Sequence, residues 1–130
     1  MALMTDRADI ATALRAGGII DITTTGRKSG RPRRIEIVFF NVDERVYITG
    51  LPGKRAWMAN LVADPRMTVH LKRGLMTDLP ATARIVENEV ERRAVLEQAL
   101  VTWKRQHQLE AFVADAPLIE VIFDDSLLSE

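Results

Sequence analysis

The sequence predicts an α+β fold that is mainly β: a mostly antiparallel, six-stranded barrel with helices packed outside it. The apolar runs are short, rich in β-branched and aromatic residues, and joined mostly by turns, which is typical of strands that pair with their neighbours along the chain. Only two or three stretches have the periodicity of a helix. The 130 residues are 47% hydrophobic, and without a repeat or linker they fit one domain, residues 1–130.

The first half of the chain is predicted to contain one helix and three strands. The helix spans Asp6–Ala16, because Ile10 and Leu14 lie on one face and a pair of glycines ends it. The strands are expected at Gly18–Thr25, Arg33–Asn41 and Arg45–Thr49, the last two joined by a turn at residues 41–44.

The second half is predicted to contain two helices and three strands. A helix is expected at Lys54–Ala63, with Trp57 and Leu61 towards the core, and an Asp-Pro pair ends it because the residue before a proline avoids the α region. A longer helix at Glu89–His107 begins with Asn88 as its N-cap. Its buried positions are expected to be Val90, Ala94, Leu96 or Leu100, Val101 and Trp103. The strands are expected at Met67–Lys72, Pro80–Val86 and Leu118–Phe123.

The turn between the first two strands is strongly basic and contains Gly26, Gly30 and Pro32. Cations, a hydroxyl and backbone N–H groups freed by glycine form an anion cradle when they share one tight connection. The candidate ligands here are Arg27, Lys28, Ser29, Arg31, Arg33 and Arg34. The alternative interpretation is a solvated hairpin tip that contributes to solubility.

A second basic segment, Gly50–Arg55, leads from the third strand into the helix that contains Trp57. Free N–H groups and the helix dipole attract phosphate to a helix N-terminus, and a bound anion would offset the unfavourable position of cations there. The candidate ligands in this segment are Gly50, Gly53, Lys54 and Arg55. The alternative is a plain strand-to-helix connection.

The charge is unevenly distributed although the formal net charge is zero. Residues 27–55 contain eight Lys or Arg and three acids, a net of +5, so the remainder carries −5. This dipole favours a small anionic ligand near residues 27–55. A nucleic-acid module is disfavoured, because the total charge is zero and few aromatic residues accompany the basic stretch.

Several other kinds of site are disfavoured by the composition. The chain has no cysteine, and His70 and His107 do not form a metal-binding pattern, so no metal site is expected. No set of acid–base or nucleophilic residues stands out, and the catalytic residues stay unknown. The N-terminus resembles neither a signal peptide nor a membrane span, so a cytoplasmic protein without an integral membrane segment is expected.

Three motifs in order resemble the deazaflavin (coenzyme F-420)-dependent nitroreductase and quinone reductase family. They are TTTGRKSGRPR at Thr23–Arg33, VYITGLPGKRAWMANL at Val46–Leu61 and DPRMTVH at Asp64–His70. Members of that family have the flavin-reductase-like split β-barrel shared with pyridoxamine-phosphate oxidases. The resemblance covers about residues 19–72, and the combination T-G-R-K-S-G-x-P-R, W-x-x-N-L and D/N-P-R is fairly specific.

The resemblance implies an oxidoreductase that transfers a hydride from reduced coenzyme F-420 to a quinone, nitro or activated-alkene acceptor. The alternatives are FMN as the cofactor, or a non-catalytic barrel that carries a cofactor or an amphipathic anion. The cofactor phosphate would meet Arg27, Lys28, Ser29 and Arg33 or Arg34, and the ring would lie near Gly50–Arg55 and the start of the Trp57 helix. The cations left over, Arg31, Lys54 and Arg55, would meet the carboxylates of the F-420 tail. Trp57 itself is expected to be a packing anchor and not a catalytic residue.

Two features depart from the family pattern. Glu36 stands where the family often has proline, and the loop before Trp57 is shorter than in better-known members. Glu36 would alter hydride affinity if it lay beside a redox ring, whereas a salt bridge to Arg34 is the structural alternative. The expected partner is a small-molecule electron acceptor, and a homodimer is left open.

Overall fold

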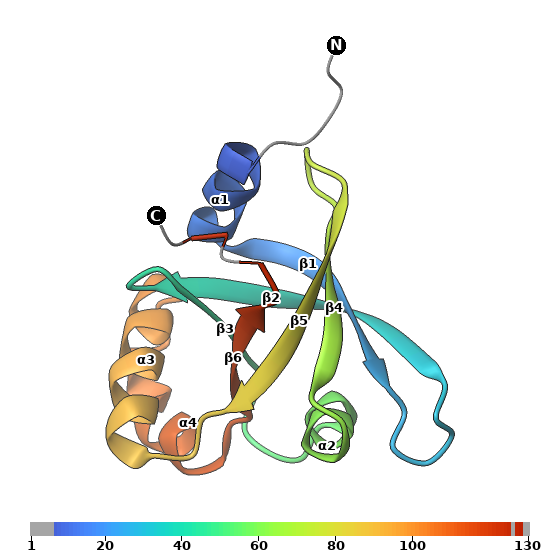
Figure 1. Ribbon diagram of the computed structural model, residues 1–130. Helices are drawn as coiled ribbons and strands as arrows, with labels where there is room; N and C mark the ends of the chain where they lie inside the picture. Colours follow the sequence, from blue (N-terminus) through green and yellow to red (C-terminus); the bar gives the residue numbers. More distant parts are fainter. Residues whose placement is uncertain (1–6, 126, 129–130) are drawn as a thin grey trace.

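Six antiparallel strands form a closed barrel in the computed structural model, which describes residues 7–125 and 127–128 (Figure 1). The strands are β1 (Gly18–Thr25), β2 (Pro32–Val42), β3 (Arg45–Thr49), β4 (Arg66–Leu71), β5 (Thr77–Ile85) and β6 (Leu118–Phe123). Their order around the barrel is β1-β2-β3-β6-β5-β4, and pairing of β4 with β1 closes it. The predicted antiparallel six-stranded barrel is therefore confirmed.

The described helices are α1 (Arg7–Ala16), α2 (Ala56–Ala63), α3 (Glu89–Thr102) and α4 (Leu109–Asp115), with a 3-10 turn η1 (Gln106–Gln108) between the last two. Figure 1 shows α2, the β1–β2 turn and the β3–α2 loop at one end of the barrel, whereas α1 lies at the other end. Helices α3 and α4 pack along one side. No helix in the described ranges is long and apolar enough to cross a membrane.

The apolar side chains form two cores because the barrel wall is covered on one side. Inward-facing residues such as Ile22, Ile48 and Val69 fill the barrel together with Trp57 and Leu61 from α2. The second core lies between the wall and helices α3 and α4. Tyr47 points into this second core, so residues on both faces of β3 are buried.

The long helix is shorter than predicted, because it ends at Thr102 and not at His107. Its end is a Schellman motif: Arg105 N–H donates to Leu100 O at 2.8 Å, and Lys104 N–H donates to Val101 O at 3.1 Å. Lys104 takes the left-handed conformation with φ +59°, a role that glycine fills more often. With a lysine in that place the sequence carried no stop signal, and the short helix α4 that follows was not predicted.

The buried face of α3 also differs from the prediction. Val95, Leu96, Ala99 and Leu100 are buried, whereas Val90, Ala94 and Val101 are exposed. Leu96 and Leu100 were predicted correctly. The other buried positions are Val95 and Ala99, which were not predicted. Trp103 is half-buried and packs edge-on against Phe40, with ring centroids 5.5 Å apart.

The other element boundaries shift by a few residues. Helix α1 begins at Arg7, and the predicted first residue, Asp6, lies outside the described residues. Strand β5 begins at Thr77, three residues before the predicted start. Helix α2 begins at Ala56, two residues later than predicted, with Arg55 as an extended N-cap residue (φ −132°). Lys54 and Arg55 therefore belong to the loop before α2 and not to the helix.

Candidate cofactor site

The basic turn between β1 and β2 is closed by its own backbone. Gly26 N–H donates to Arg31 O, and Gly30 N–H donates to Gly26 O, both at 2.8 Å. Ser29 Oγ accepts a 3.1 Å hydrogen bond from Arg31 N–H. A Cβ at Gly26 would lie 2.7 Å from Ser29 Oγ and 3.3 Å from Arg31 O, so a side chain there would displace the Ser29 hydroxyl and crowd the backbone of the turn. The turn is a fixed structure, and Arg27, Lys28 and Ser29 project from it.

Asn60 of α2 fixes the basic turn to the helix. Its Oδ1 accepts from Arg27 N–H at 3.1 Å and from Arg27 Nη1 at 3.3 Å, and its Nδ2 donates to Thr24 Oγ1 at 3.3 Å. Only 6% of Asn60 is exposed. Asn60 was not among the predicted site residues, although it is the N of the W-x-x-N-L motif, one helical turn after Trp57.

A hollow of about 410 Å³, here called the turn hollow, lies between the basic turn and α2. It brings together the predicted residues Arg27, Lys28, Ser29, Arg33 and Trp57. Its remaining lining residues are Thr24, Gly26, Ile35, Ala56 and Asn60. The turn hollow therefore combines cations, a hydroxyl and the N-terminal edge of a helix.

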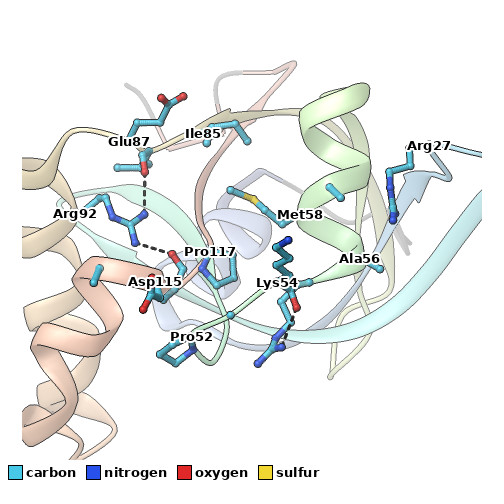
Figure 2. Close-up of a pocket in the computed structure, with 16 residues that line it drawn as sticks. Arg27, Pro52, Lys54, Ala56, Met58, Ile85, Glu87, Arg92, Asp115 and Pro117 are labelled. Carbon is cyan, nitrogen blue, oxygen red and sulfur yellow. Dashed lines mark hydrogen bonds between the residues drawn. The ribbon is translucent and has the colours of Figure 1, made fainter.

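A second and larger hollow of about 920 Å³, here called the wide hollow, adjoins the turn hollow at Arg27 and Ala56. Its walls are α2 and the loop before it on one side, and the end of β5, Arg92 and the α4–β6 connection on the other. Figure 2 shows Lys54 extending from the loop towards Met58. Apolar groups of Met58, Ile85 and Pro117 line it together with charged side chains, so it suits an amphipathic ligand.

The cations around the two hollows have no carboxylate partner. In the part of the chain that the structure describes, every ion pair lies elsewhere. The lining cations without an ion pair are Arg27, Lys28, Arg33, Lys54, Arg55 and Arg92. Arg31, which also has no ion pair among the described residues, lines neither hollow. These cations outnumber the two carboxylates that line the wide hollow, Glu87 and Asp115. Such an excess of positive charge attracts an anion, which gains charge-assisted hydrogen bonds on binding.

A family comparison identifies the kind of protein that carries this site. The sequence profile of the F420H(2)-dependent quinone reductase family matches residues 2–122. The chain belongs to this family. It is a reductase, and its cofactor is coenzyme F-420. No curated protein matches the chain.

Solved structures similar to the reductase share its split-barrel fold. A conserved hypothetical protein from Mycobacterium tuberculosis superimposes with a TM-score of 0.77 at 16% identity, covering 94% of the reductase and 82% of that chain. A protein provisionally named a pyridoxamine 5′-phosphate oxidase, from Listeria innocua, gives 0.70 at 11% identity, covering 92% and 94%. A protein provisionally named a 5-nitroimidazole antibiotic resistance protein, from Bacteroides thetaiotaomicron, gives 0.67 at 13% identity, covering 94% and 82%.

Two charged residues of β2 face away from the hollows of the reductase. Arg34 lines neither hollow and instead pairs with Asp21 on the outer face of the barrel, at 2.9 Å. The salt bridge between Glu36 and Arg34, which was one of two alternatives for Glu36, is not formed. Lys72 Nζ instead lies between the carboxylates of Glu36 (2.5 Å) and Asp21 (2.7 Å). The hydrogen bonds from Lys72 and Arg34 lower the pKa of Asp21, and those to Asp21 and Glu36 raise the pKa of Lys72. Glu36 is thus occupied on the outer face.

Gly50 and Trp57 pack against each other next to the turn hollow. A Cβ at Gly50 would lie 3.5 Å from Pro117 Cγ and 3.7 Å from Trp57 Cζ2, so the loop packs closely on both rings. Trp57 is 8% exposed and belongs to the barrel core, while one edge borders the turn hollow. Gly50 itself lines neither hollow.

His70 has a structural environment in the reductase. Its Nε2 lies 2.6 Å from Thr23 Oγ1, and its Nδ1 lies 2.7 Å from Asp78 Oδ1. These bonds join β4 to β1 and β5 across the outer face. No group of potential metal ligands is found among the described residues.

Proposed function

We propose that the reductase holds the phosphate of coenzyme F-420 in the turn hollow and the deazaflavin ring along the adjoining wide hollow. The observation that carries this proposal is the set of cations without ion pairs around two connected hollows. The donor set suits the cofactor chemically, because a phosphate and a tail of several carboxylates need cations at more than one place. FMN has no such tail and would leave the cations of the loop before α2 solvated.

Each residue of the turn hollow has a distinct role in this proposal. Arg27 is held by Asn60 and offers the rest of its guanidinium to the phosphate, while Lys28 and the Ser29 hydroxyl approach from the turn. The sequence left open whether Arg33 or Arg34 meets the phosphate. We assign this role to Arg33, because it lines the hollow and Arg34 does not. The N-terminus of α2 adds favourable backbone N–H groups.

The wide hollow would then orient the ring and the acceptor. When bound, the cofactor supplies the hydride chemistry, and the protein supplies binding, orientation and exclusion of water. Met58, Ile85 and Pro117 would give apolar surface against a flat ring, and Lys54 and Arg55, which line the same hollow, would meet the tail carboxylates. We infer a quinone as the acceptor, in agreement with the family, and nitro compounds and activated alkenes as further acceptors.

The test is a cofactor titration of wild type, Arg27→Ala and Lys28→Ala, followed by quinone-dependent oxidation of the reduced cofactor. Each charge-assisted hydrogen bond stabilises a complex by roughly 1.5–3 kcal/mol. Either substitution should therefore weaken F-420 binding about ten- to a hundredfold. Unchanged affinity in both variants would return the basic turn to the solvated-tip interpretation. Tight binding without turnover of any acceptor would favour the cofactor carrier instead.

We also infer that the reductase self-associates as a homodimer. One structural neighbour, described as a domain-swapped dimer, gives a TM-score of 0.62 at 24% identity and covers 80% of the reductase and 79% of that chain. Light scattering coupled to size-exclusion chromatography measures the mass directly. A mass of one chain at micromolar concentration would refute the dimer.

A further inference from the structure

The side chain of Arg92 donates to four backbone carbonyls. From the first turn of α3 its Nε donates to Val113 O at 2.9 Å and its Nη1 to Val86 O at 3.0 Å. Its Nη2 donates to Phe112 O at 3.0 Å and to Ala116 O at 2.6 Å. Figure 2 shows the guanidinium at the wall of the wide hollow, opposite Lys54.

Three of these carbonyls lie at the end of α4. Phe112 O already accepts from Ala116 N–H at 2.9 Å, so Arg92 is its second donor. Val113 lies in the last turn of α4, where carbonyls lack partners within the helix, and Ala116 is the C-cap residue. A cation at a helix C-terminus also interacts favourably with the helix dipole. Burial lowers the pKa of Arg92, while the nearby charge of Asp115 opposes that effect, and an arginine stays protonated in either case. Arg92 therefore fixes the end of α4 as a charged clamp.

The segment that Arg92 holds also supports the loop before α2, which contains Lys54 and Arg55. Asp115 O accepts from Gly53 N–H at 3.0 Å, and Pro117 O accepts from Thr49 Oγ1 at 2.5 Å. Gly53 has φ +117°, a conformation that glycine alone adopts without strain, and Lys54 and Arg55 follow it. A shift at residues 115–117 would therefore pass directly to the loop cations.

We propose that Arg92 is a positioning residue, which sets the place of Lys54 and Arg55 through the α4–β6 connection and Gly53. The proposal rests on the function proposed above, because it assigns those two cations to the tail of F-420. Arg92 does not touch the ligand in this proposal. It affects F-420 binding only by holding Lys54 and Arg55 in position. Removing Arg92 and removing the loop cations should therefore affect the same part of the binding energy.

Arg93 provides a matched control. It neighbours Arg92 on α3, but its side chain pairs with Glu110 at 2.6 Å and Glu89 at 3.3 Å on the exposed side. Arg93→Met removes an arginine that also joins α3 to α4 without touching the clamped carbonyls. It should therefore leave the loop before α2 in place.

The experiment is a double-mutant cycle with F-420 affinity as the readout. Arg92→Met should weaken F-420 binding about five- to tenfold in the wild-type background, the size expected from two misplaced surface ion pairs. In a background that carries Lys54→Met and Arg55→Met, the same change should have less than about a twofold effect. Arg93→Met should have no effect in either background. Equal losses in both backgrounds would show that Arg92 acts independently of the loop cations, and would overturn the proposal.

A second variant covers the case in which Arg92→Met does not fold. Arg92→Lys keeps the charge and the apolar stem, but a single ammonium cannot bridge the four carbonyls. It should show the same non-additivity, and amide exchange at Gly53 should become faster than in Arg93→Met. If Arg92→Lys leaves both the amide exchange of Gly53 and the F-420 affinity unchanged, the positioning role is refuted, while the proposed function still stands. A wild-type protein that does not bind F-420 would instead overturn the proposed function and this inference together.

Discussion

Replacing Asn60 by alanine removes the contact that joins the basic turn to α2. The side chain makes two hydrogen bonds with Arg27 and one with Thr24, at 3.1, 3.3 and 3.3 Å, and it is 6% exposed. A buried polar group left without its partner costs about 1–3 kcal/mol, so the loss of all three bonds should lower the free energy of unfolding by about 2–4 kcal/mol. Chemical denaturation measures this change.

The same substitution should weaken F-420 binding about tenfold, because Arg27 then has to be ordered by the ligand itself. Asn41→Ala is the matched control. Asn41 Nδ2 donates to Leu14 O, and Asn41 Oδ1 accepts from Glu44 N–H, both at 3.1 Å, and neither hollow is lined by Asn41. Asn41→Ala should therefore lose stability without losing affinity. Equal affinity in Asn60→Ala and wild type would refute the claim that Asn60 orders the phosphate site.

Three further outcomes follow from the structure. Arg34→Ala should leave F-420 affinity within about twofold of wild type, since this arginine faces away from the hollow, whereas Arg27→Ala should weaken it at least about tenfold. Trp57→Ala should lower the free energy of unfolding by about 3–5 kcal/mol, as measured by denaturation, because the ring fills the core. The pKa of Asp64 falls from 3.8 to about 2 beside Arg66, so its contribution to stability is complete above pH 4 and is lost as the pH falls towards 2. Asp64→Asn should flatten the stability curve in that window, and an unchanged curve would contradict the assignment.

The strands and the basic turn could be predicted because their signals are local. Strand β1 follows directly from a run of β-branched residues, and the glycines of the turn mark where the chain reverses. The end of α3 could not be predicted, because Lys104 adopts the left-handed conformation without the glycine that would signal it. Local sequence patterns also did not predict α4. Carbonyls at its C-terminal end accept hydrogen bonds from Arg92, which lies about 20 residues earlier in the chain.

For the candidate site, the sequence indicates which residue types are present but not towards which side of the barrel wall each side chain points. Alternation along β2 means that Arg33 and Arg34 face opposite sides of the wall, yet the sequence does not say which side holds the hollow. Only the structure shows Arg33 at the hollow and Arg34 with Asp21. The partner of Glu36 is Lys72, 36 residues away, and that pairing depends on the strand order around the barrel.

The most direct test of the central claim compares F-420 and FMN binding to the wild-type protein at low and raised salt. The two cofactors share a phosphate and a flat tricyclic ring, but F-420 alone has a tail of carboxylates. If the cations around both hollows serve that ligand, F-420 should bind more tightly than FMN, and its affinity should fall more steeply as salt screens the charges. Tight FMN binding with no measurable F-420 affinity would contradict this account of the site.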